Sequence, residues 1–139
     1  MFRLDYFSFY GGNWRNMNLK EKNEQIALML GWRQGHIDPL EQRWKNQWFT
    51  SHGNSHKILL FRLDWNWIMI AVEFIESIQD GIYQVDILQE GCKISLHCTN
   101  TFIDETVSKA SEPLTKLEST FLAVAEFAFL YNHKLLKQR

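Results

Sequence analysis

The chain has 139 residues, of which 45% are hydrophobic and 22% charged, and its 15 basic and 16 acidic residues leave a formal net charge of −1. This length and composition indicate one folded domain and exclude a disordered or fibrous chain. The charge balance argues against a surface that is basic throughout, which a general binder of nucleic acid or anionic lipid would need.

Residues 1–16 are rich in aromatic side chains, but Arg3 and Asp5 interrupt them and no small-residue cleavage pattern follows. We therefore do not interpret them as a secretory signal. The stretch that starts at Met17 has the pattern of a natural protein start, so we expect an N-terminal extension (1–16) and a single domain (17–139). No uncharged apolar stretch reaches the ~18–20 residues that a membrane-spanning helix needs, so we expect no membrane partner.

The first predicted helix covers residues 18–30. Asn18 and Glu21 stand three residues apart, the spacing of a capping box in which each side chain satisfies a backbone N–H of the first turn. Gly31 is a natural end for this helix.

A second set of helix-start signals follows at Asp38, where Asp at the N-cap is followed by Pro39 and Glu41. These residues predict a short helix that ends at about Trp48. After a loop, the apolar run over 57–63 predicts a short strand.

Asp64 is placed to cap a central helix over residues 65–79. Apolar side chains occupy most of its circumference, which predicts a helix buried on most sides. A narrow polar stripe contains Asn66, Glu73, Glu76 and Ser77.

Alternating apolar and polar residues predict a β-hairpin from strands 82–88 and 92–98, with Gly91 in a three-residue connection. Residues 102–107 are a candidate third strand. Thr115 and Glu118 form another capping box, which opens a closing helix to about residue 135.

Together these elements predict an α+β fold. The central hairpin (82–98) belongs to a small antiparallel sheet, and helices 64–79 and 115–135 pack on it as a helix/sheet/helix sandwich.

The residues give little support for catalysis. Cys92 and Cys98 on one strand lie roughly 20 Å apart, too far for a disulfide or a shared metal, and two such thiols suit a reducing cytosol. His52 and His56 have the spacing of a helical metal pair, but Gly53 and Asn54 between them indicate a loop. We therefore predict a cytoplasmic protein that is not an enzyme, with no catalytic residues, metal or cofactor.

The tryptophans are more informative, because all six lie at or before residue 67. Within residues 32–63, five basic residues against two acidic ones leave a local charge of +3. A basic, aromatic segment is typical of a binding surface, since Trp and Arg dominate interface hot spots. The predicted partner-binding residues are Arg43, Trp44, Lys45, Trp48, Phe49 and His52.

Three alternatives remain open for this segment, one of which is a small hydrolase or metal protein centred on His52 and His56. Its rings, including those of Trp44 and Trp48, could cover the core instead of a partner. The segment could also bind RNA or DNA by stacking bases on its rings.

The chain resembles a group of small phage and prophage proteins of the ABA-sandwich type. The resemblance covers about residues 17–135 and is carried by four motifs: Leu30-Gly31-Trp32, Asp64-Trp65-Asn66, Lys116-Leu117-Glu118 and Glu126-Phe127. It implies a sheet held between helices and an accessory protein without catalytic residues. By class, it implies a protein in the bacterial cytoplasm that inhibits or modulates a host protein, such as a CRISPR nuclease or another defence complex.

Overall fold

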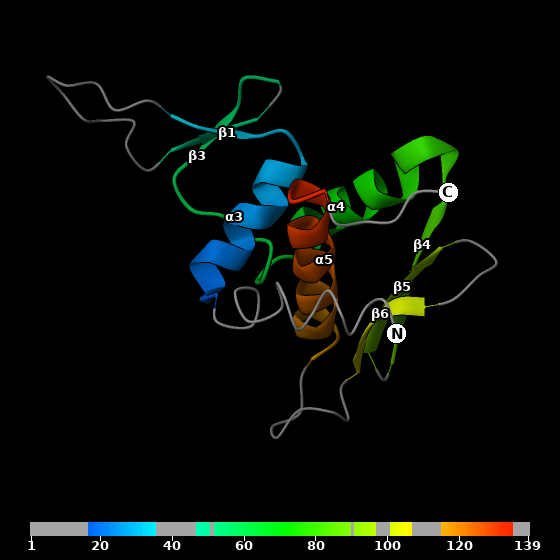
Figure 1. The fold of residues 1–139 in the computed structure, drawn as a ribbon. Helices are drawn as coiled ribbons and strands as arrows, with labels where there is room; N and C mark the ends of the chain where they lie inside the picture. Colours follow the sequence, from blue (N-terminus) through cyan, green and yellow to red (C-terminus); the bar gives the residue numbers. More distant parts are fainter. Residues whose placement is uncertain are drawn as a thin grey trace, which may run out of the picture.

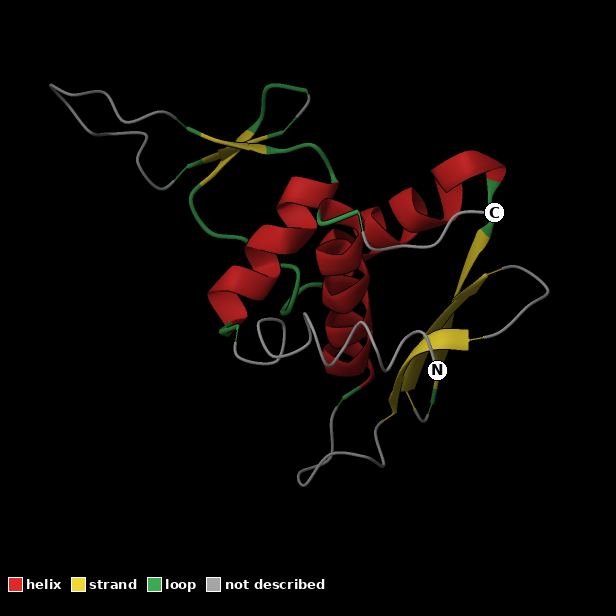
Figure 2. Cartoon of the chain, viewed as in Figure 1, coloured by secondary structure: helices red, strands yellow, loops and turns green. Residues whose placement is uncertain are grey.

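The computed structural model describes residues 17–35, 47–50, 52–89, 91–96, 101–106 and 115–134. These ranges contain three α-helices, one short 3-10 helix and two three-stranded antiparallel sheets (Figure 1, Figure 2). The prediction of an α+β fold with a small antiparallel sheet packed by helices is confirmed. In this part of the chain, no helix combines the length and apolar character that a bilayer crossing requires.

Helix α3 covers Leu19–Met29, as the capping box predicts. The backbone N–H of Glu21 donates to Asn18 Oδ1 at 2.8 Å, and the N–H of Asn18 donates to Glu21 Oε1 at 3.4 Å. Gly31 follows the helix with a φ of +82°, the left-handed conformation that favours glycine at a helix end. The predicted extension (1–16) and most of the predicted second helix (38–46) lie outside the described residues.

Helix α4 covers Trp65–Ser77, and Asp64 caps it by accepting a hydrogen bond of 2.8 Å from the N–H of Asn66. A 3-10 turn, η2 (Ile78–Asp80), leads to Gly81 at a φ of +88°. The positive φ reverses the chain direction here and starts the larger sheet.

The larger sheet has the order β4 (Tyr83–Leu88), β5 (Gly91–Leu96) and β6 (Thr101–Thr106). The predicted hairpin and third strand are thus confirmed, although Leu88 pairs with Gly91 and the connection is one residue shorter than expected. Alternation along the hairpin places Tyr83, Val85, Cys92 and Ile94 on the buried face.

Helix α5 (Lys116–Asn132) forms the centre of the core. Thr115 caps it, and residues 119–129 are buried almost all round, because α5 contacts α3, α4 and all three strands of the larger sheet. The amide of Asn132 donates to the backbone oxygen of Gln25 at 2.8 Å and to its Oε1 at 2.9 Å, which ties the end of α5 to the second half of α3.

A second, smaller sheet was not predicted. It has the order β1 (Arg33–Gln34), β2 (Trp48–Phe49) and β3 (Ser55–His56) and stands on the opposite side of the helices from the larger sheet (Figure 1). Trp48 was expected at the end of a helix, and this prediction is wrong. The tryptophan pairs with Gln34 and His56 instead, because contacts between distant segments override local helix signals.

The predicted strand over 57–63 is also wrong. These residues form bends and turns, in which the carbonyl of Leu60 accepts hydrogen bonds from the N–H groups of Leu63 and Asp64, both at 3.0 Å. Of the apolar residues in this run, Phe61 is fully buried, whereas Ile58 and Leu63 face solvent.

Candidate functional site

The predicted partner-binding residues fall partly within the small sheet. Trp48 and Phe49 form β2, and His52 lies exposed in the turn between β2 and β3. Arg43, Trp44 and Lys45 lie outside the described residues, so their role stays a prediction.

The register of the small sheet sends Trp48 and Phe49 to opposite faces. Residues that pair directly across antiparallel strands share a face, and neighbours along a strand alternate. Trp48 therefore shares a face with Gln34 and His56, and Phe49 lies on the other face with its partners Arg33 and Ser55. Since Trp48 is only 5% exposed, it belongs mainly to the core, whereas Phe49 is partly exposed.

An aromatic cluster attaches the small sheet to the start of α4. The ring of Trp32 lies 5.8 Å from His56, 5.3 Å from Phe61 and 5.6 Å from Trp67, measured between ring centroids. Trp67 also meets His56 at 4.7 Å and Phe61 at 5.2 Å in edge-on contacts. Such pairs each contribute about 0.5–1.5 kcal/mol beyond the burial of their surface.

This cluster also shows where the two loop histidines lie. His56 packs against two tryptophan rings, while His52 is exposed, so the pair does not share one environment. Within the described ranges, no group of three or more His, Cys, Asp or Glu side chains is arranged to hold a metal ion.

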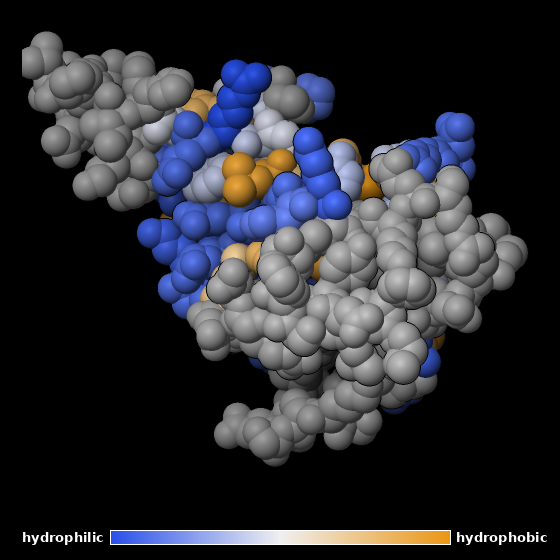
Figure 3. Space-filling model, in the orientation of Figure 1, coloured by the Kyte–Doolittle hydropathy of each residue, from blue (hydrophilic) through white to orange (hydrophobic). Residues whose placement is uncertain are grey.

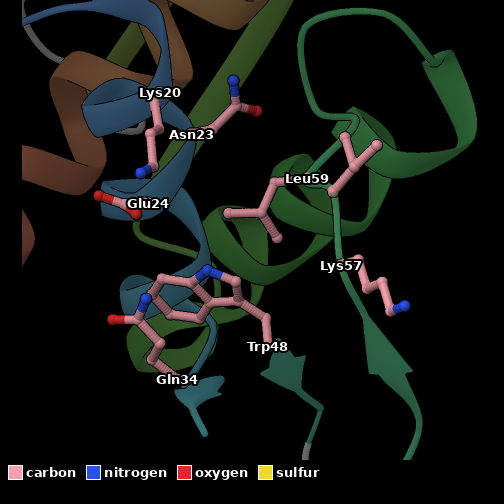
Figure 4. Close-up of a pocket in the computed structure, with 8 residues that line it drawn as sticks. Lys20, Asn23, Glu24, Gln34, Trp48, Lys57 and Leu59 are labelled. Carbon is pink, nitrogen blue, oxygen red and sulfur yellow. The ribbon is translucent and has the colours of Figure 1, made fainter. Parts of the chain in front are cut away.

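A pocket of about 290 Å³ lies between α3 and the segment that follows β3 (Figure 4). Its described lining comprises Lys20, Asn23, Glu24, Gln34, Trp48, Lys57, Ile58 and Leu59. Sequence reasoning identified Trp48 alone among them, because the others come from three segments that only the folded chain brings together. In the view of Figure 3, the surface over α3 is covered mostly by hydrophilic side chains.

The first half of α4 presents an exposed apolar surface. The prediction that this helix is buried on most sides is wrong at its N-terminal end, where Trp65 is 40% exposed and Ile70 47% exposed. Met69 lies one turn after Trp65 and is also exposed, and Leu63, just before the helix, is 67% exposed. We call these four residues the α4 apolar surface.

The sequence contained a signal for this surface. A helix that is apolar nearly all round has more apolar residues than one core-facing side can bury. Some of them must therefore face either another element or a partner. In α4 the buried arc contains Ile68, Ala71, Val72 and Ile75. The remaining apolar residues of the first two turns are left outside it.

Comparisons with known proteins found no relative. The sequence matches no protein-family model and no curated protein, and the structure matches no solved structure.

Proposed function

We propose that the protein is a non-catalytic binding protein that inhibits or modulates a host protein through the α4 apolar surface. One observation carries the proposal: Leu63, Trp65, Met69 and Ile70 expose large apolar side chains on one short stretch of the chain. Contiguous exposed apolar side chains are typical of protein-binding sites, and a central tryptophan is a frequent hot spot.

The arrangement of α4 supports a docking surface with a polar edge. Apart from Asn66, the exposed residues of its first two turns are apolar, and the exposed residues that follow include Glu73, Glu76 and Ser77. Protein interfaces commonly have an apolar centre and a polar rim, so this gradient suits the edge of a partner-binding surface.

The resemblance to small phage proteins favours a bacterial host protein as the partner, and a defence complex such as a CRISPR nuclease in particular. The predicted contact residues Arg43, Trp44 and Lys45 belong to the same proposal as a second contact region. Phe49 and His52, both at least partly exposed, lie on the chain close to them.

Binding to RNA or DNA has weaker support. Of the basic residues of the 32–63 segment, Arg62 lies 3.8 Å from Glu118 in an ion pair. Among the described residues this leaves Arg33 and Lys57 as exposed cations of the segment. Two exposed cations contribute little to neutralising a phosphate backbone, which dominates nucleic-acid affinity, so the described part of the segment does not favour this alternative.

The proposal is tested by identifying a partner in bacterial host lysate with the full chain as bait and then measuring its affinity for the purified partner. The double variant Trp65→Ser with Ile70→Ser should weaken binding by about tenfold or more, because truncation of hot-spot side chains costs more than about 1 kcal/mol each. Arg43→Ala tests the second contact region in the same assay.

Glu73→Ala is the matched control, since it changes an exposed side chain on the same arc of α4. It should bind within about twofold of the unaltered chain, because the contacts that surround a hot spot are close to energetically neutral. The proposal is wrong if no host protein is retained specifically, or if the double variant melts normally and binds with full affinity.

A further inference from the structure

The pocket beside α3 combines an apolar floor with a charged rim. The buried Trp48 and the half-buried Leu59 lie between the exposed Lys20 and Lys57, which stand on opposite walls (Figure 4). The side chains of Lys20, Lys57 and Glu24 make no hydrogen bond or ion pair with any other described residue. Two cations against one anion give the described lining a net charge of +1.

Asn23, in the wall of this pocket, has a side-chain oxygen that accepts no hydrogen bond from a described residue. Its side chain is 9% exposed, and its Nδ2 donates to the carbonyl of Leu19 at 3.0 Å. That bond fixes the orientation of the amide, and Oδ1 is left buried without a donor among the described residues. A buried acceptor without a partner costs about 1–3 kcal/mol, so a ligand that brings an N–H group would recover this cost.

We propose that the pocket binds the C-terminal residue of a partner protein when that residue is hydrophobic. Such a residue combines three groups that the lining complements: an apolar side chain for Trp48 and Leu59, a backbone N–H for Asn23 Oδ1, and a carboxylate for the lysines. The volume of about 290 Å³ is at the lower limit of small-molecule pockets, which suits one residue rather than a longer segment.

The same features favour a peptide over a phosphate group of a nucleic acid. A phosphate carries only acceptor oxygens at neutral pH, so it would leave Asn23 Oδ1 unsatisfied and would bring no apolar group to the floor. In a C-terminal residue the carboxylate, the backbone N–H and the side chain are attached to the same Cα, so all three fit within the space that the pocket offers.

This inference rests on the proposed function, because it gives the binding partner a chemical class. It uses none of the residues of the α4 apolar surface. The two proposals can therefore fail separately: a peptide titration needs no host protein, and the affinity assay above needs no intact pocket.

The test is an NMR titration of the isotope-labelled full chain with N-acetylglycyl-leucine. The expected result is a shift of the Trp48 indole N–H signal and a dissociation constant on the order of 1 mM, in keeping with a ligand of few atoms. The C-terminal amide of the same peptide should bind at least about fivefold more weakly, because it lacks the charge that the lysines recognise. N-acetylglycyl-glycine, which lacks the apolar side chain, should bind more weakly by a similar factor.

Two variants locate the binding. Lys20→Gln with Lys57→Gln should remove the difference between acid and amide, and both positions are exposed, so the fold should persist. Arg33→Gln is the matched control, because Arg33 is an exposed cation that stands next to Gln34 in β1 but is not part of the described pocket lining.

The proposal is overturned if the peptide shifts no signal of the pocket, or if acid and amide bind equally to the unaltered chain. It is also overturned if inorganic phosphate shifts the Trp48 signal at a lower concentration than the peptide, which would indicate an anion site. If Arg33→Gln lost the difference between acid and amide as the double variant does, the preference for the acid would reflect the overall charge of the protein. That result would also refute the proposal.

Discussion

Replacing Phe61 with alanine should test how the small sheet is attached to the rest of the molecule. Phe61 is fully buried, and its ring lies 5.3 Å from that of Trp32 and 5.2 Å from that of Trp67. A buried Phe→Ala change lowers the free energy of unfolding by about 3–5 kcal/mol, through lost burial and the cavity left behind. We expect Phe61→Ala to lower the free energy of unfolding by about 4 kcal/mol, because the loss of each ring contact adds to the loss of burial.

Urea unfolding followed by circular dichroism measures this change. With a slope of about 2 kcal/mol per molar, a loss of about 4 kcal/mol lowers the unfolding midpoint by roughly 2 M. Leu63→Ala is the matched control: it lies in the same turn but is 67% exposed, so it should change stability by less than about 0.5 kcal/mol. A loss below about 1 kcal/mol for Phe61→Ala, or equal losses for both variants, would show that the aromatic cluster does not hold the fold together.

Two further predictions concern pH and backbone conformation. Burial raises the pKa of Tyr83 above its usual value of 10.0, so above pH 10 the unfolded chain loses this proton while the folded chain keeps it. Stability therefore falls as pH rises above 10, and Tyr83→Phe should reduce that fall in urea unfolding measured at pH 9 and at pH about 11; an unchanged fall would contradict the assignment. Gly31→Ala should cost about 1 kcal/mol, because a φ of +82° strains an L-residue although a Cβ there meets no atom within 4 Å. Gly31→Asn should cost less in the same assay, and equal losses would indicate a cause other than the backbone.

The helices and the larger sheet could be predicted because their signals are local. Asn18 and Thr115 indicate where their helices begin, because each caps its helix through a residue only three positions away. The alternation along residues 83–96 fixes which face of the hairpin is buried. Interactions of this kind need no knowledge of distant segments.

The small sheet and the pocket could not be predicted in the same way. Strands of two residues show no periodicity, and Trp48 finds its neighbours Gln34 and His56 only through the fold. The apolar run at 57–63 resembles a strand because periodicity cannot separate a short buried strand from a turn with one buried ring. Asn23 gave no signal at all, since a single amide in a helix is usually exposed to solvent.

The hydrogen bonds from Asn132 to Gln25 join residues that are 107 positions apart in the chain. Helix α3 precedes α5 in the chain, so it is synthesised before the helix against which it packs. The nascent chain therefore holds α3 and the hairpin without their main partner until α5 emerges, and the final core can close only then.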